Sequence, residues 1–199
     1  MFILIQGQRA KVELTFTPKG TAGIGRATVE ALAKHNPAHI YFSGRNRKAA
    51  ESLITDVKHV SPSTSLTFLE IDLSSLASVK NAIATRFIHD RLDVLICNAG
   101  IMSVPPAVSK DGYEIQFATN HLGHAMLIHE LLPTLLKTAE SPGSDVRVVI
   151  LTSVGYRGHP RQGIVFSSLG TPQDIVFGRW LRYGYGVPIH CLVVRRVVH

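Results

Sequence analysis

Apolar and polar positions follow two rhythms along the first 150 residues of the chain. Short runs that alternate apolar and polar residues, or that are rich in β-branched and aromatic residues, predict strands. Longer runs with apolar residues three and four positions apart predict helices. The expected strands are residues 11–17, 39–44, 65–73, 92–100 and 146–153, and the expected helices are residues 23–36, 48–60, 76–89 and 121–139.

This alternation of strands and helices predicts a parallel sheet with helices on both faces. Because crossover connections are right-handed, the chain is expected to form a three-layer α/β, doubly wound sheet of the Rossmann type. Beyond residue 154 the rhythm is lost in a stretch rich in Gly, Pro and Ser. The apolar run at residues 189–199 is a candidate final strand with nothing after it to cover it, so we expect the C-terminal strands to be incomplete.

Composition excludes several classes of protein. With 45% hydrophobic and 18% charged residues, the chain can form a core and is too apolar to be disordered. The net charge of +7 permits an anionic partner, but no nucleic-acid motif accompanies it, so no nucleic-acid partner is expected. Two cysteines make no disulfide framework, and Cys97 is expected to pack as a small apolar residue. No apolar run approaches the roughly 18 residues that span a bilayer, and the apolar N-terminal run is too short for a signal peptide. We therefore expect a soluble, cytoplasmic protein with no membrane span.

Candidate ligand-binding residues follow the expected strands, because ligands of doubly wound sheets bind beyond the carboxyl ends of strands. After the first strand comes KGTAGIG, residues 19–25, whose glycines let a pyrophosphate approach the N–H groups of the next helix. Such a turn taken alone is equally a plain connection. Arg45 follows the second strand, where a cation accommodates a 2′-phosphate and favours NADP over NAD. A solvated surface arginine is the alternative.

Two further polar residues lie at the carboxyl ends of the third and fourth expected strands. Asp72 can hydrogen-bond an adenine edge, and Asn98 together with Gly100 can form the floor under a ribose. Asp and Asn are also common cap and turn residues, so a purely local role is open for both. Three histidines on one expected helix, His121, His124 and His129, have no Cys or acid at ligand spacing, and no metal site is expected.

As a set, these motifs resemble the short-chain dehydrogenases/reductases. GTAGIG, SGRN, DL, NAG, NHLGH and ILTS stand in the order found in that family, over roughly residues 11–184. NHLGH and the long 153–183 interval are most similar to the retinol-dehydrogenase-like branch, which is also common among specialised-metabolite reductases. The resemblance implies one dinucleotide-binding domain over residues 1–199, with an atypical tail at residues 185–199. It implies cofactor contacts at Gly20, Gly23, Ile24, Gly25, Arg45, Asp72, Asn98 and Gly100.

The resemblance also implies an activity and three catalytic residues. The reaction would be hydride transfer between NADP(H) and a small alcohol or ketone, and related enzymes often form homodimers. Asn120 matches the asparagine that holds a water in a proton relay, and Ser153 matches the serine that hydrogen-bonds the substrate oxygen. Tyr183 matches the tyrosine that exchanges a proton with that oxygen. Tyr185 is the second candidate, but it has Ile189 four residues later and is expected to be incidental.

The chain departs from the family pattern at both ends. The lysine expected four residues after Tyr183 is Val187, and Pro188 disrupts the helix that should carry the pair. At the other end, Pro18 and Lys19 replace the Thr-Gly that opens the glycine-rich turn. We expect a truncated or frame-shifted ending. The alternatives are a catalytically inactive relative that retains at most nucleotide binding or an interaction role, and a binder of anionic ligands that uses the arginine-rich C-terminus.

Overall fold

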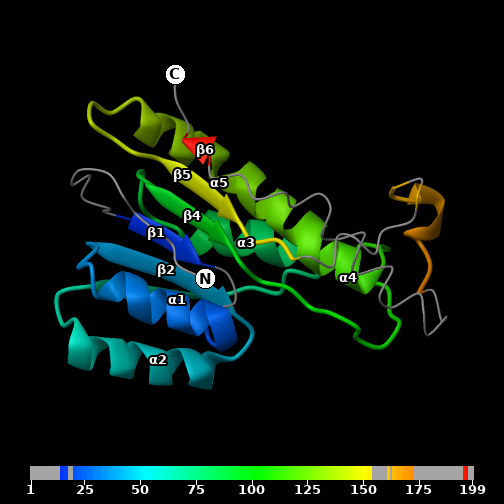
Figure 1. Ribbon diagram of the computed structural model, residues 1–199, viewed down its shortest axis with the longest axis horizontal. Coiled ribbons are helices and arrows are strands. Elements are labelled where there is room, and N and C mark those ends of the chain that lie inside the picture. The colour runs from blue at the N-terminus through cyan, green and yellow to red at the C-terminus, as the bar shows by residue number, and fades with distance from the viewer. Residues whose placement is uncertain (1–13, 18–19, 154–160, 162, 173–194, 197–199) are drawn as a thin grey trace.

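Five parallel strands form the central sheet of the fold in the computed structural model. The structure describes residues 14–17, 20–153, 161, 163–172 and 195–196. The strand order is β3-β2-β1-β4-β5-β6, so the order reverses between β1 and β4 (Figure 1). Neighbouring strands from β3 to β5 pair in parallel, whereas β6 runs antiparallel to β5. The strands are β1 (Leu14–Thr17), β2 (His39–Gly44), β3 (Ser65–Glu70), β4 (Val94–Cys97), β5 (Arg147–Ile150) and β6 (Arg195–Arg196).

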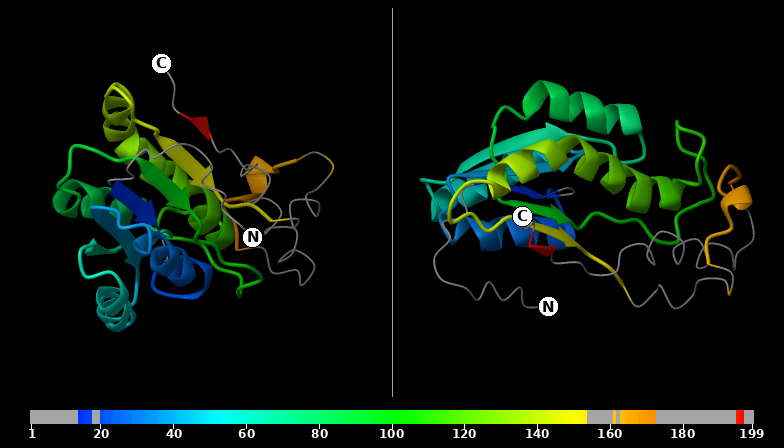
Figure 2. Two further views of the ribbon diagram at one scale, coloured as in Figure 1. Left: turned by 60° about the vertical axis from the view of Figure 1, so that its left-hand side comes forward. Right: turned by 90° about the horizontal axis from the view of Figure 1, so that it is seen from above.

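Helices cover both faces of this sheet. The helices are α1 (Gly23–Ala33), α2 (Arg47–Val60), α3 (Leu76–Arg86), α4 (Ile115–Phe117), the π-helical turn η1 (Ala118–Leu122), α5 (Gly123–Ala139) and the 3-10 turn η3 (Phe166–Ser168). The α1 and α2 helices lie on one face, and α3 and α5 lie on the other (Figures 1 and 2). The expectation of a three-layer Rossmann-type fold is thereby confirmed.

Alternate residues of the strands supply two cores. Phe16, Tyr41 and Leu95 pack with Leu127 and Leu131 of α5 in the larger cluster, on the face that α3 also covers. The neighbouring residues point to the opposite face, as the two-residue period of a strand requires.

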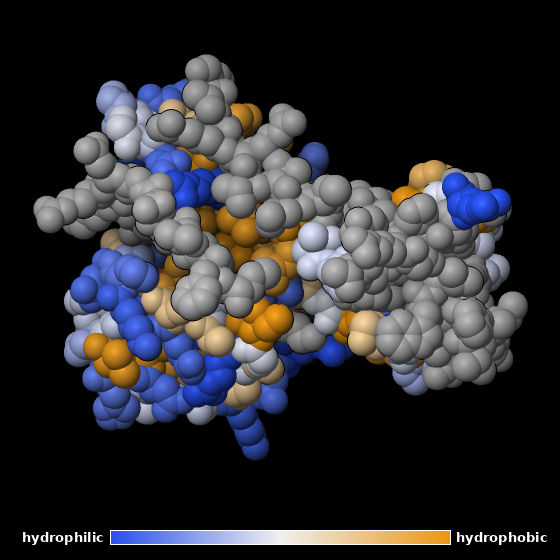
Figure 3. All heavy atoms as spheres, viewed as in Figure 1, coloured by the Kyte–Doolittle hydropathy of each residue, from blue (hydrophilic) through white to orange (hydrophobic). Residues whose placement is uncertain are grey.

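On that opposite face, Ile40 and Phe42 pack against Val29 of α1 and Leu53 of α2. A smaller cluster of Val94, Ile96 and Val149 continues it across β4 and β5. In the view of Figure 3, apolar side chains are visible in the middle of the face, over the sheet.

The element boundaries differ from the predicted ones mainly at the ends. The predicted strand 39–44 is correct, but the strands predicted as 92–100 and 146–153 are shorter, because their last residues turn away from the sheet. The first helix ends at Ala33 and not at Asn36, because Asn36 has a left-handed φ of 50° and precedes a proline. The helix predicted from residue 121 begins earlier, at Ile115, and α5 continues through Pro133.

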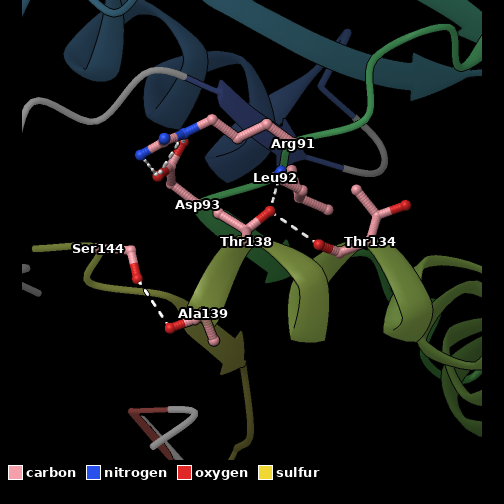
Figure 4. A network of polar contacts seen from close by, with 7 residues as sticks. All are labelled: Arg91, Leu92, Asp93, Thr134, Thr138, Ala139 and Ser144. Carbon is pink, nitrogen blue, oxygen red and sulfur yellow. Dashed lines mark hydrogen bonds and ion pairs between the residues drawn. The ribbon is translucent and has the colours of Figure 1, made fainter. Parts of the chain in front are cut away.

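The amino edge of the sheet is fixed by side-chain hydrogen bonds to the backbone. Thr138 near the end of α5 accepts a hydrogen bond from the Leu92 N–H (2.8 Å) and donates one to the Thr134 carbonyl (2.7 Å), as Figure 4 shows. Asp93, which follows Leu92, pairs with Arg91 (Figure 4). These contacts anchor the start of β4 at the edge opposite the candidate site.

Two threonines of the central strand are buried in a way that costs free energy. The side chains of Thr15 and Thr17 are 0% exposed, and neither hydroxyl has a hydrogen-bond partner among the described residues. A buried hydroxyl without a partner costs about 1–3 kcal/mol by mutational data. Thr17 therefore lowers the stability of β1.

We predict that Thr17→Val raises the free energy of unfolding by about 1 kcal/mol, because valine keeps the shape and removes the unpaired hydroxyl. Urea unfolding measures this change. Thr138→Val is the matched control, since its hydroxyl is bonded, and it should lower the free energy of unfolding. A loss of stability in Thr17→Val of the size seen in Thr138→Val would contradict the prediction.

Candidate functional site

The carboxyl ends of the parallel strands lie along one edge of the sheet. Gly44, the last residue of β2, pairs with Glu70 of β3, and Cys97, the last residue of β4, pairs with Ile150 of β5. The segments that follow these strands therefore start side by side. The strand order reverses between β1 and β4, which is where ligands bind in folds of this kind.

The glycine-rich turn after β1 is held close to β2. The Gly20 N–H donates to the Ser43 carbonyl at 2.8 Å, and a Cβ at Gly20 would lie 2.7 Å from the Phe42 Cβ. Gly23 begins α1 with φ of +54°, a left-handed conformation that favours glycine. Gly25 is buried, whereas Ile24 is 65% exposed at the helix N-terminus. The described part of the turn is thus close to β2 and has a left-handed glycine at the helix start, whereas contact of the first N–H groups of α1 with a pyrophosphate stays a prediction.

Two arginines follow β2, and they differ in their partners. Arg47 pairs with Glu70 at 2.9 Å. Arg45 is exposed and forms no ion pair or side-chain hydrogen bond within the described part of the chain. Its charge is therefore available to an anion at this end of the edge. The alternative of a solvated surface arginine has the same geometry and stays open.

Asp72 makes a local turn after β3. Its Oδ1 accepts hydrogen bonds from the Ser74 N–H (3.0 Å) and hydroxyl (2.7 Å), and its own N–H donates to Ser78 Oγ (3.0 Å). The local role that the sequence left open is therefore present. Contact with adenine stays a prediction.

Asn98 and Gly100 lie in the segment that follows β4. Among the described residues, the nearest atom to a Cβ at Gly100 would be Asn120 Oδ1, at 3.6 Å, which is an ordinary van der Waals contact. Cys97, the last residue of β4, is buried, and burial raises the pKa of its thiol to about 12. Cys97 is therefore protonated at neutral pH and is not a nucleophile.

Asn120 lies in the π-helical turn η1 and not at the start of a helix. Both ends of its side-chain amide bind one residue: Oδ1 accepts from the Ile101 N–H, and Nδ2 donates to the Ile101 carbonyl, each at 2.8 Å. The Asn120 carbonyl lies 2.9 Å from the Nδ1 of buried His124. The side chain of Asn120 thus holds the segment after β4, and π-helical turns are frequent at functional sites.

Of the other two predicted catalytic residues, Ser153 lies within the described part of the chain and Tyr183 does not. Ser153 is part-buried, three residues beyond the end of β5, and so belongs to the same edge. Tyr183 lies outside the described residues, as do Pro18, Lys19, Val187 and Pro188. The structure thus brings together the segments that carry the predicted cofactor contacts, Asn120 and Ser153, but leaves Tyr183 untested.

Three residues at this edge of the sheet were not predicted from the sequence as site residues. Gln116 accepts a hydrogen bond from the Ser103 N–H, and the buried Glu114 carboxylate caps the start of α4. Gly123 is the first residue of α5 and packs directly against Leu73, in the segment after β3. For Gln116 the available signal was its position four residues before Asn120, because in an α-helix that spacing puts two side chains on one face.

Among the described residues, no group of three His, Cys, Asp or Glu side chains could hold a metal ion. The same residues include no helix that is both long and apolar enough to cross a membrane.

A family model described as short chain dehydrogenase matches residues 19–168, three quarters of the chain. The chain belongs to the short-chain dehydrogenase family. An uncharacterised oxidoreductase of Schizosaccharomyces pombe is 39% identical over 168 residues, which are 82% of this chain and 48% of the relative. The chain thus spans about half the length of that relative.

Solved structures agree on the fold. A crystal structure of an uncharacterised Mycobacterium paratuberculosis protein matches with a TM-score of 0.66 and 27% identity, over 87% of this chain and 57% of that one. The NADP complex of Pseudomonas aeruginosa RhlG matches with a TM-score of 0.60 and 22% identity, over 86% of this chain and 62% of that one. At that identity, the RhlG likeness concerns the fold alone.

Gly123 lets the start of α5 approach Leu73 closely, and we predict that Gly123→Ala is strongly destabilising. A Cβ at Gly123 would lie 2.3 Å from the Leu73 carbonyl oxygen and 2.9 Å from the Leu73 Cβ, so α5 or the segment after β3 must shift. We expect the free energy of unfolding to fall by about 3 kcal/mol, the upper range for overpacking.

The matched control is Gly170→Ala, because a Cβ there meets no atom of the described residues within 4 Å. Thermal and urea unfolding should give nearly wild-type values for Gly170→Ala. Equal stability of the two variants would show that α5 is not held against Leu73.

Proposed function

We propose that the chain contains the cofactor-binding part of an NADP-dependent oxidoreductase, which transfers hydride between NADP(H) and a small alcohol or ketone. The observation that carries the proposal is the charge of Arg45, which has no ion-pair partner among the described residues and lies at the same sheet edge as the glycine-rich turn. Arg47 is paired with Glu70, so Arg45 is the better-suited cation for a 2′-phosphate. A fold likeness to a protein with bound NADP is compatible with this assignment.

The site divides into two halves around the strand-order reversal. Arg45 and Asp72 follow β2 and β3, and would hold the adenosine half of the cofactor. The turn from Gly20 to Gly25 would hold the pyrophosphate. Asn98 and Gly100 follow β4, and would lie under the ribose of the nicotinamide half, nearest to Ser153 after β5.

Bound NADPH would supply the hydride, and the chain's own residues would orient the substrate and move the proton. The Ser153 hydroxyl would donate a hydrogen bond to the substrate oxygen, and the Tyr183 hydroxyl would exchange a proton with it. Asn120 would support the proton relay through its backbone, because its side-chain amide is occupied by Ile101. Its carbonyl faces His124, so a relay water there would have to share that oxygen with the imidazole.

A second candidate function is nucleotide binding without catalysis, and one residue favours it. A free phenol has a pKa near 10, so a tyrosine acts as a base near neutrality only with a cation beside it. The family places a lysine four residues after the tyrosine, whereas this chain has Val187. The catalytic version of the proposal is hydride transfer between NADP(H) and an alcohol or ketone, in specialised-metabolite biosynthesis. The silent version is cofactor binding alone.

Cofactor titration tests the proposal. We predict that NADPH binds more tightly than NADH, and that Arg45→Ala weakens NADPH binding about tenfold or more while leaving NADH unchanged, because a charge-assisted hydrogen bond contributes about 1.5–3 kcal/mol. Fluorescence of the reduced nicotinamide measures both affinities. Arg47→Ala is the matched control and should have the smaller effect, since Glu70 already neutralises that arginine.

The outcomes separate the two versions. NADPH oxidation with a panel of ketones and aldehydes supports the enzyme, and binding without oxidation supports the silent protein. Equal loss of NADPH affinity in both arginine variants would show that Arg45 does not specifically recognise the 2′-phosphate. If the protein bound neither NADPH nor NADH, both versions would be overturned.

A further inference from the structure

Two amide side chains, one from α4 and one from the adjoining turn η1, hold the segment that follows β4. Asn120 binds both the N–H and the carbonyl of Ile101, and Gln116, four residues earlier, accepts a hydrogen bond from the Ser103 N–H at 2.8 Å. Gln116 is 0% exposed and Asn120 is 5% exposed, so water does not compete for these bonds. The segment Ile101–Ser103 is therefore fixed at both of its ends, with Met102 between them.

The hydrogen bond from Ser103 holds an unfavourable backbone conformation. Ser103 has φ of 55°, in the left-handed region that residues with a Cβ seldom adopt. Such a conformation persists only where its surroundings determine it. Gln116 Oε1 is the side-chain acceptor that meets the Ser103 N–H there.

Gln116 is itself held in place by a buried acid. The Glu114 carboxylate accepts hydrogen bonds from the backbone N–H groups of Gln116 (3.0 Å) and Phe117 (2.9 Å). The Glu114 N–H donates to the Leu169 carbonyl at 2.7 Å. The start of α4 is thus anchored, and the position of the Gln116 side chain follows from it.

We propose that Gln116 is a positioning residue of the cofactor site, which holds Ser103 and thereby fixes Asn98–Gly100 for the nicotinamide half of NADPH. This inference rests on the proposed function. It follows from the order of the chain, because Gly100 is directly joined to Ile101 and lies beside Asn120 Oδ1. The adenosine half would be held across the strand-order reversal, after β2 and β3, so it would not depend on Gln116.

Gln116→Met tests whether only the nicotinamide half of the cofactor depends on Gln116. Methionine has a similar length and lacks the amide acceptor. We expect its NADPH affinity to fall about tenfold, through the unsatisfied Ser103 N–H and the release of the segment. The affinity for 2′,5′-ADP, which carries only the adenosine half and its 2′-phosphate, should stay within twofold of wild type. Gln116→Glu keeps an oxygen acceptor at the same position and should recover most of the NADPH affinity.

Thr138→Val is the matched structural control. It removes another buried side-chain oxygen that accepts a backbone N–H, at the opposite edge of the sheet. It should be destabilised as Gln116→Met is, and bind both ligands as the wild type does. Equal losses of NADPH and 2′,5′-ADP affinity in Gln116→Met, or no loss of either, would overturn the proposal.

Hydrogen exchange gives a readout that needs no ligand. In Gln116→Met, the Ser103 amide should exchange at least tenfold faster, while the Ile101 amide stays protected by Asn120. Unchanged exchange at Ser103 would overturn the positioning role. Wild-type protein that binds neither NADPH nor 2′,5′-ADP would overturn the proposed function, and the cofactor role of Gln116 with it, whatever the exchange shows.

Discussion

The central strand β1 pairs in parallel with β2 on one side and with β4 on the other, and the candidate site depends on this two-sided pairing. Thr15 is in register with both Ile40 of β2 and Val94 of β4. Because the strands are parallel, the segments after β1, β2 and β4 leave the sheet at one edge. Two halves of a ligand site, one on each side of β1, are a geometric consequence of that arrangement.

Close packing then ties the segments to one another. Gly123 lets the start of α5 approach Leu73, next to Asp72, while Asn120 in the preceding turn holds Ile101. One helix end therefore contacts both the segment after β3 and the segment after β4. The π-helical turn η1 lies between α4 and α5, and it carries Asn120. Gln116 likewise holds the backbone of Ser103, two residues after Ile101, by a hydrogen bond.

The sequence predicted the fold well, because strand and helix alternate with clear periods. The strand 39–44 is the clearest case, since it is a compact run of aromatic and β-branched residues bounded by Pro37 and Gly44. Element ends were less predictable. Asn98 and Ser153 continue apolar runs in sequence, yet both lie beyond the last paired residues of their strands.

Side-chain partners were the least predictable part of the site. The pairing of Arg47 with Glu70 depends on the register of β2 and β3, which a linear pattern does not contain. The same is true of Gln116, which meets Ser103 because the chain turns back between them, where Val108 and Glu114 form an antiparallel bridge. Asp72 shows the converse, since its local turn with Ser74 is typical of Asp after a strand. The role of Tyr183 was inferred from the family pattern, and it lies outside the described residues.

The central claim is that the carboxyl edge of the sheet binds a dinucleotide, and amide hydrogen exchange with and without NADPH tests it most directly. Ligand binding protects the amides that it covers or rigidifies. The account predicts slower exchange in residues 20–25, 45–47 and 98–103, with no change at Leu92, whose amide is bonded to Thr138 at the opposite edge. Protection confined to the opposite edge, or no protection at saturating NADPH, would contradict it.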